Sequence, residues 1–150
     1  MKKLFLVLFA LMASGLFAEW ICDVNTDPIT DESRVVFIYT DGGFHSPVFI
    51  MRFQQGELDA YINWSQYFSD RDRNDVIVRF DKNQPITLST ALSTDSTATF
   101  FLQSSLVLSK MLKAESAVFR AVPYRESPVT IIVPLSEFKR LYEQHKDLIK

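Results

Sequence analysis

Short runs of alternating apolar and polar residues, separated by turn residues, fill most of the chain before its first predicted helix. VVFIYT at 35–40 and VFIMRF at 48–53 are two such runs, and Asp41-Gly42-Gly43 lies between them. Gly56 follows, and ELDAYINW at 57–64 then places its apolar residues on one face. Alternation with a period of two is typical of strands, and glycine accepts the positive φ of tight turns. The pattern predicts strands at these positions, with a hairpin that turns at Gly56.

Three further runs follow: VIVRF at 76–80, ITLSTAL at 86–92 and TATFFLQ at 97–103. In the first of them the apolar residues alternate with Arg79, which places Arg79 and Asp81 on the exposed face. Short strands that recur about every 8–12 residues, with turns between them, are typical of antiparallel sandwiches and barrels. We expect one strand in each of these runs.

Two helices are expected beside the strands. Ser104–Lys113 has apolar residues at helical spacing and leads into a strand at 117–122. After a last strand at 129–133, Ser136 is a candidate N-cap of an amphipathic C-terminal helix. The apolar stripe of that helix comprises Phe138, Leu141, Tyr142, His145, Leu148 and Ile149. The predicted fold class is mainly β (α+β): an antiparallel β-sandwich or partly open barrel with one short internal helix and a C-terminal amphipathic helix.

The N-terminal residues have the pattern of a secretory signal peptide. Lys2 and Lys3 precede the apolar run Leu4–Met12, and small residues follow. Cleavage after Gly15 also fits, but we take residues 1–18 as the signal peptide and 19–150 as a single β-rich domain. An uncleaved anchor would need about 20 apolar residues, more than this segment contains. We therefore expect a periplasmic protein with no stable transmembrane span after processing.

Charge and cysteine content narrow the possible functions. The chain has 16 Lys and Arg against 18 Asp and Glu; without Lys2 and Lys3 the count is 14 against 18, a net charge of −4. Its arginines are interleaved with aspartates, whereas nucleic-acid binding requires clustered positive charge, so we expect no nucleic-acid partner. Cys22 is the only cysteine, which excludes an intramolecular disulfide. A buried free thiol is expected, with a disulfide to another chain as the alternative.

The segment DRDRNDVIVRFD at 70–81 has carboxylates or amides at its first, third and fifth positions, as an EF-hand calcium loop does. Its sixth position is Asp75 instead of glycine, and its twelfth is Asp81 instead of the longer glutamate. The second half of the segment also has the pattern of a strand. We therefore expect a charged turn followed by a strand, with no metal site and no cofactor.

No catalytic constellation is evident in the sequence. His45 lies in a glycine-containing loop, His145 lies on the apolar stripe of the last helix, and no G-x-S-x-G motif is present. We expect a non-enzymatic protein with no catalytic residues. The alternative is a small secreted hydrolase that uses acidic residues, or Cys22 with a histidine that folding brings near it.

The order of several motifs resembles a known family. They are Trp20, NTDPITDES at 25–33, INW at 62–64, VIVRFD at 76–81, LSTD at 92–95, TATFF at 97–101, VFRAVPY at 118–124 and PLSEF at 134–138. This order resembles the VasI/TagO-like accessory proteins of type VI secretion systems. The resemblance implies an accessory protein that binds another envelope protein or a cell-wall component. A phage-encoded envelope exclusion or immunity factor is an alternative.

The resemblance also indicates which residues to examine. The family-like structural positions are Trp20, Trp64, Phe80, Pro123 and Tyr124. The candidate interaction surface consists of Arg79, Asp81, Ser93, Asp95 and Arg120. In one departure, Met51, Arg52 and Phe53 stand where such proteins often have a cysteine, so the disulfide that the resemblance would imply is not available.

Overall fold

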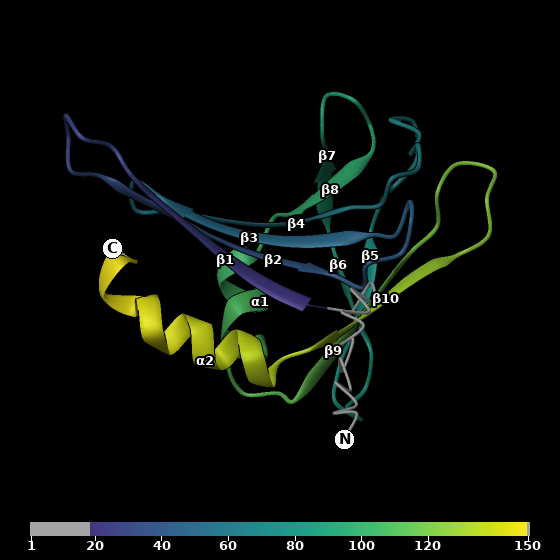
Figure 1. Ribbon diagram of the computed structural model, residues 1–150. Helices are drawn as coiled ribbons and strands as arrows, with labels where there is room; N and C mark the ends of the chain where they lie inside the picture. The colour runs from purple at the N-terminus through teal and green to yellow at the C-terminus, as the bar shows by residue number, and fades with distance from the viewer. Residues whose placement is uncertain (1–18, 150) are drawn as a thin grey trace, which may run out of the picture.

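The computed structural model describes residues 19–149, which form two antiparallel sheets, two α-helices and a short terminal 3₁₀ helix (Figure 1). The predicted signal peptide, residues 1–18, lies outside the described residues. The mainly-β fold class is confirmed, and the two sheets are separate layers that do not close into a barrel.

The large sheet has six strands in the order β1-β2-β3-β4-β8-β7, and every neighbouring pair is antiparallel. The strands are β1 Glu19–Thr26, β2 Ser33–Thr40, β3 Val48–Gln54, β4 Glu57–Asn63, β8 Ala98–Phe101 and β7 Thr90–Leu92. The predicted hairpin between β3 and β4 is confirmed, and Gly56 in its turn has a φ of 75°, which glycine adopts without strain. β1 was not predicted, and it pairs with β2 along its whole length.

The small sheet has four strands in the order β10-β9-β5-β6, also antiparallel. They are β10 Val129–Pro134, β9 Ser116–Ala121, β5 Val76–Phe80 and β6 Ile86–Leu88. The prediction of one strand across 86–92 is wrong. The chain leaves the small sheet after Leu88, which pairs with Val76, and β7 joins the large sheet beside β8. This crossing connects the two layers.

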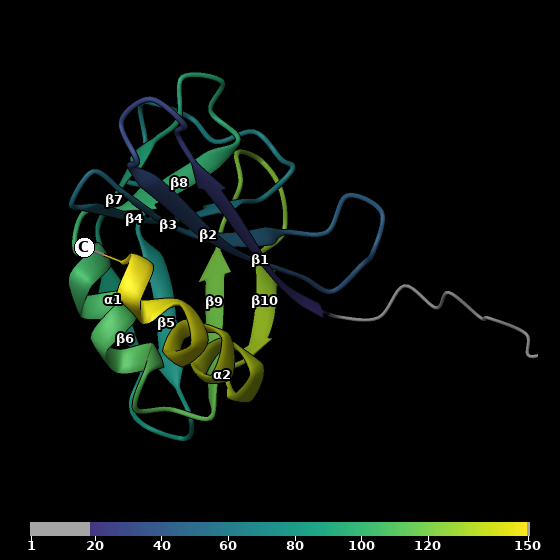
Figure 2. The ribbon, with the colours of Figure 1, turned by 60° about the vertical axis from the view of Figure 1, so that its left-hand side comes forward.

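Both helices are present at the predicted places. α1 spans Ser104–Met111, and α2 spans Ser136–His145 and continues into η1, Lys146–Leu148. Both helices lie on the side of the large sheet that faces the small sheet (Figure 2). The predicted N-cap is wrong: Leu135 holds that position, and Ser136 makes no capping hydrogen bond because it is already the first helical residue.

The core lies between the two sheets and α2. The rings of Phe49 and Phe119, one from each sheet, stack with their centroids 5.1 Å apart. Trp20 packs against Phe138 of α2 and donates its indole N–H to Pro134 O at 2.6 Å, which ties β1 to the end of β10. Because the inner faces of the two sheets form this core, their outer faces point away from it.

Candidate functional site

Two of the five candidate interaction residues lie together on the outer face of the small sheet. Arg79 of β5 is paired with Val118, and Arg120 of β9 is paired with Ile77, two residues along each strand. Directly opposed residues share a face of an antiparallel pair, so the two arginines are diagonal neighbours on one surface. The core-facing residues of β5, Val76, Val78 and Phe80, point the other way, as predicted.

The two arginines are held by oxygens that carry no formal charge. Arg79 donates from Nε to Asn83 O at 2.9 Å and from Nη2 to Lys82 O at 3.1 Å, and Arg120 Nε donates to Thr130 Oγ1 at 3.0 Å. Within residues 19–149, neither guanidinium forms an ion pair with a carboxylate. Two positive charges on this surface are therefore oriented but not neutralised.

Apolar side chains surround these arginines on the same surface. Ile132 of the edge strand β10 is 64% exposed, and Ile77 of the central strand β5 is 46% exposed. Val118 lies between Ile132 and Arg79 in the register of the sheet. We call this surface the arginine face; it comprises Ile77, Arg79, Val118, Arg120, Thr130 and Ile132. The isoleucines were not among the predicted site residues, although the same alternation that exposes Arg79 also exposes Ile77.

Asp81 does not belong to the arginine face, which corrects the sequence prediction. It follows the last residue of β5 and has a φ of 52°, so its side chain leaves the direction of the strand. Its Oδ1 accepts hydrogen bonds from the backbone N–H groups of Glu115 (2.8 Å) and Ser116 (3.0 Å). Asp81 therefore anchors the start of β9, with its carboxylate turned to the backbone of Glu115 and Ser116 instead of standing beside Arg79.

Ser93 and Asp95 form the turn between β7 and β8 of the large sheet, so the structure does not bring them to the arginine face. Ser93 Oγ donates to Asp95 Oδ1 at 2.6 Å, and the same oxygen accepts from Thr97 N and Thr97 Oγ1. The bonds from Ser93 and then Thr97 stabilise the carboxylate and lower the pKa of Asp95. These residues stabilise a turn.

Of the family-like positions, three are in the core and two are in the loop between β9 and β10, where Pro123 is buried and Tyr124 is exposed. Trp20, Trp64 and Phe80 are all buried. Pro123 and Tyr124 lie between β9 and β10, where Tyr124 meets Tyr67 edge to face at 6.1 Å between ring centroids. The Arg125 guanidinium lies 4.9 Å from the centre of the Tyr124 ring. The buried positions support the fold. Tyr124 of this loop forms an exposed aromatic pair with Tyr67.

Folding does bring Cys22 to a histidine, which the hydrolase alternative requires. Cys22 Sγ lies 3.6 Å from His145 Nδ1, at the end of α2. The same nitrogen lies 2.9 Å from Leu141 O, which only accepts, so Nδ1 carries a proton and does not take one from the thiol. Burial, and then the negative charge of Asp23, raise the pKa of the Cys22 thiol. A neutral thiol is a poor nucleophile, so this arrangement does not activate Cys22.

The segment with the spacing of a calcium loop forms a turn followed by a strand, as predicted. Residues 70–75 form a charged turn with an Arg73–Asp75 ion pair, and β5 begins at Val76. In the described part of the chain, no three His, Cys, Asp or Glu side chains gather as metal ligands.

Neither α-helix within residues 19–149 has the length and apolar character needed to cross a bilayer.

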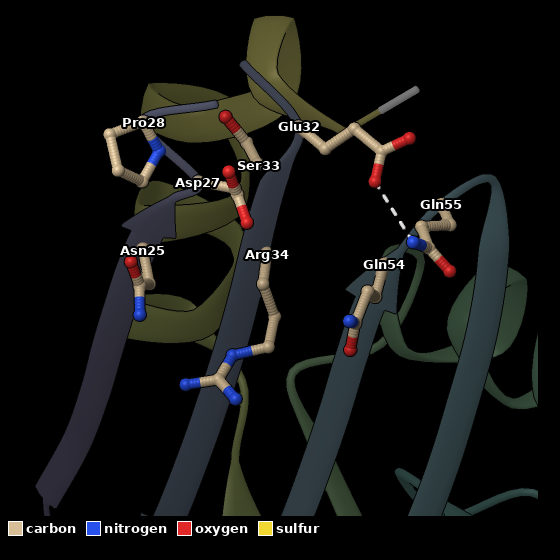
Figure 3. A pocket seen from close by; sticks show the side chains of 8 residues that line it. All are labelled: Asn25, Asp27, Pro28, Glu32, Ser33, Arg34, Gln54 and Gln55. Atoms are coloured by element: carbon tan, nitrogen blue, oxygen red, sulfur yellow. Dashed lines mark hydrogen bonds between the residues drawn. The ribbon is translucent and has the colours of Figure 1, made fainter. Parts of the chain in front are cut away.

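A polar hollow of about 320 Å³ lies where the β1–β2 hairpin meets the β3–β4 turn (Figure 3). Its lining residues are Asn25, Asp27, Pro28, Glu32, Ser33, Arg34, Gln54 and Gln55. Gln55 Nε2 donates to Glu32 Oε2 at 2.9 Å, which bridges the two turns. Ligand pockets are lined mainly by apolar and aromatic side chains, and this hollow has none beyond Pro28. It is therefore a weaker candidate than the arginine face.

Comparison with known proteins adds no relative: no family model, no curated protein and no solved structure matches this chain. The resemblance to type VI accessory proteins therefore stays an expectation that its motifs support.

Proposed function

We propose that this protein is a secreted, periplasmic, non-enzymatic accessory protein that binds another protein of the cell envelope through the arginine face. The observation that carries the proposal is the pair of guanidinium groups, Arg79 and Arg120, among exposed isoleucines. The signal-like residues 1–18 support a periplasmic setting. The motif order, which resembles type VI accessory proteins, supports an accessory role.

The arginine face indicates the chemistry of its partner. Arg79 and Arg120 are held in place by hydrogen bonds to the protein, so less side-chain entropy is lost when a carboxylate pairs with them. Ile77, Val118 and Ile132 add apolar area that a partner can remove from water. The best-matched partner is a protein surface with acidic side chains beside apolar ones.

The test is capture of envelope proteins from periplasmic and membrane extracts, followed by measurement of the affinity of the captured protein. We expect a double substitution, Arg79→Glu with Arg120→Glu, to weaken binding at least about tenfold, because close charge pairs at interfaces couple by about 1.5 kcal/mol or more. Ile132→Lys, which leaves both arginines in place, is expected to weaken binding as well. The affinity of the unsubstituted protein should fall as salt is added.

A matched control moves the same amount of charge elsewhere: Arg71→Glu with Lys113→Glu, two exposed positions outside the arginine face. This control variant should bind as the unsubstituted protein does. Thermal unfolding of every variant shows whether it keeps its fold. The proposal fails if the extracts contain no specific partner, or if folded variants of the arginine face bind as tightly as the control.

A further inference from the structure

A continuous row of apolar side chains crosses the outer face of the large sheet. The strand register places one such residue from each strand side by side, and consecutive members are direct partners. In spatial order they are Ile21, Ile38, Ile50, Tyr61, Phe100 and Ala91. We call these six residues the apolar row. With about 4.8 Å between strands, five intervals make it about 24 Å long.

None of the described elements covers this row. α1, α2 and the small sheet all lie on the opposite face of the large sheet, the inner face that holds Phe37 and Phe49 (Figures 1 and 2). Ile21 on one edge strand is 47% exposed and Ala91 on the other is exposed, whereas the four members between them are largely buried by their own neighbours. A contiguous apolar strip that no described element covers marks an interaction surface more often than scattered single residues do.

Both arginines beside the apolar row are already paired with carboxylates within the sheet. Arg52 pairs with Asp59 at 2.5 Å, and Arg34 pairs with Asp23 at 3.6 Å. Both ion pairs lie on the same outer face. Asp23, Arg52 and Asp59 are each two residues along their strand from the apolar row, and Arg34 is four residues from it. Two further carboxylates on this face, Glu19 and Glu57, form no ion pair within residues 19–149. This surface therefore offers no free positive charge for an anionic membrane or an acidic protein.

We infer that a second copy of this chain covers the apolar row, so that two large sheets stack face to face about a two-fold axis. A surface that is apolar along its middle, with both of its arginines already paired, fits a second copy of the same apolar strip, and two-fold interfaces pair a patch with the same patch. Stacked sheets pack about 10 Å apart with their side chains interleaved. A two-fold axis that lies midway between the two sheets, parallel to them and over the middle of the row between Ile50 and Tyr61, sets row on row.

The size of the face predicts a weak dimer. About 24 Å across the strands and about 20 Å along them gives roughly 500 Å² per copy and roughly 1,000 Å² in total. Specific, stable interfaces usually bury about 1,200–2,000 Å², so this one falls below that range, where complexes are weak and transient. The Tyr61 and Phe100 rings already stack at 4.4 Å with 17° between their planes, which reduces the side-chain entropy lost on association.

The oligomeric state of the purified protein tests the inference. Sedimentation equilibrium between about 1 and 500 μM should show a mass that rises from one chain toward two, because interfaces of this size are typical of weak, transient complexes. Ile50→Lys in the middle of the row should raise the dissociation constant at least about tenfold, since lysine buried in an apolar interface is costly. Ile21→Glu, on the edge strand, is a second variant that perturbs the sheet less.

The matched control is Ile132→Lys, the same substitution on the arginine face, and it should dimerise as the unsubstituted protein does. Circular dichroism and thermal unfolding establish that each variant is folded. The inference is overturned if the unsubstituted protein stays monomeric over the whole range, even if the apolar row then proves to bind a different protein. It is equally overturned if folded Ile50→Lys and Ile21→Glu variants dimerise normally. Neither result affects the proposed role of the arginine face.

Discussion

At the scale of single residues, polar atoms in the core are matched to specific partners. Among the described residues, every buried side-chain nitrogen and oxygen has a hydrogen-bond partner. Trp64 and Thr99 are both fully buried, and Trp64 Nε1 donates to Thr99 Oγ1 at 2.8 Å. This bond joins the end of β4 to β8, strands that are neighbours in the sheet but distant in the sequence. It explains why a polar residue occupies an inward position of β8.

Replacement of Thr99 by valine should therefore destabilise the fold. The valine keeps the shape but removes the acceptor, which leaves the buried indole N–H of Trp64 unpaired at a cost of about 1–3 kcal/mol. Urea unfolding followed by tryptophan fluorescence measures the change in the free energy of unfolding. Thr87→Val, at an exposed position of β6, is the control and should change it by less than about 0.5 kcal/mol. Equal losses in the two variants would contradict the assigned role of this bond.

The sequence predicts single-residue exposure well only where a strand alternates. The alternation in β5 correctly places Arg79 outside and Val78 inside. It does not show that Arg120 lies beside Arg79, because β5 and β9 pair across a long stretch of chain. Asp81 was misplaced for a different reason: its positive φ ends the alternation one residue after β5.

At the scale of elements, the clearest failure concerns the run at 86–92. The spacing of its apolar residues is that of one continuous strand. In the structure, however, Leu88 pairs with Val76 in the small sheet and Leu92 pairs with Thr99 in the large sheet. Ser89 lies at the break, and its carbonyl accepts from Leu102 N at 3.2 Å. Local pattern does not distinguish a strand that continues from one that changes sheets, because both keep the same alternation.

The C-terminal helix shows the opposite case, in which a local pattern was sufficient. The stripe of α2 places Phe138 in the core, where its ring lies 4.9 Å from Trp20 and 5.4 Å from Phe37 between centroids. α2 is amphipathic, and its outward face carries charged residues such as Arg140 paired with Glu137. The helix is therefore held mainly by its apolar face, as short amphipathic helices are.

Phe138→Ala should consequently destabilise the whole domain. A buried phenylalanine reduced to alanine costs about 3–5 kcal/mol, because burial is lost and a cavity is left among the aromatic rings. Chemical denaturation gives the free energy of unfolding, and near-ultraviolet circular dichroism reports the packing of Trp20. Leu148→Ala, on the partly exposed η1, should cost far less. A loss of less than about 1 kcal/mol for Phe138→Ala would mean that α2 does not depend on Phe138 for its docking.

At the scale of the whole molecule, sequence alone left the choice between sandwich and open barrel undecided. The choice depends on which strands pair over long distances: β8 joins β4, whereas β5 and β6 join β9 in the other layer. One result of this order is that, within residues 19–149, no other element covers the outer face of either sheet. The arginine face and the apolar row belong to different sheets, and both point away from the shared core.

If both surfaces bind as inferred, they should bind at the same time. A dimer formed through the apolar row leaves one arginine face free on each copy, so the complex with the envelope partner should contain two chains of each. Light scattering of the purified complex, at concentrations where the protein alone is dimeric, measures its mass. Ile50→Lys should reduce this complex to one chain of each. The double variant Arg79→Glu with Arg120→Glu should still form the dimer but should no longer bind the partner. A one-to-one complex of the unsubstituted protein would instead mean that the partner displaces the second copy from the large sheet.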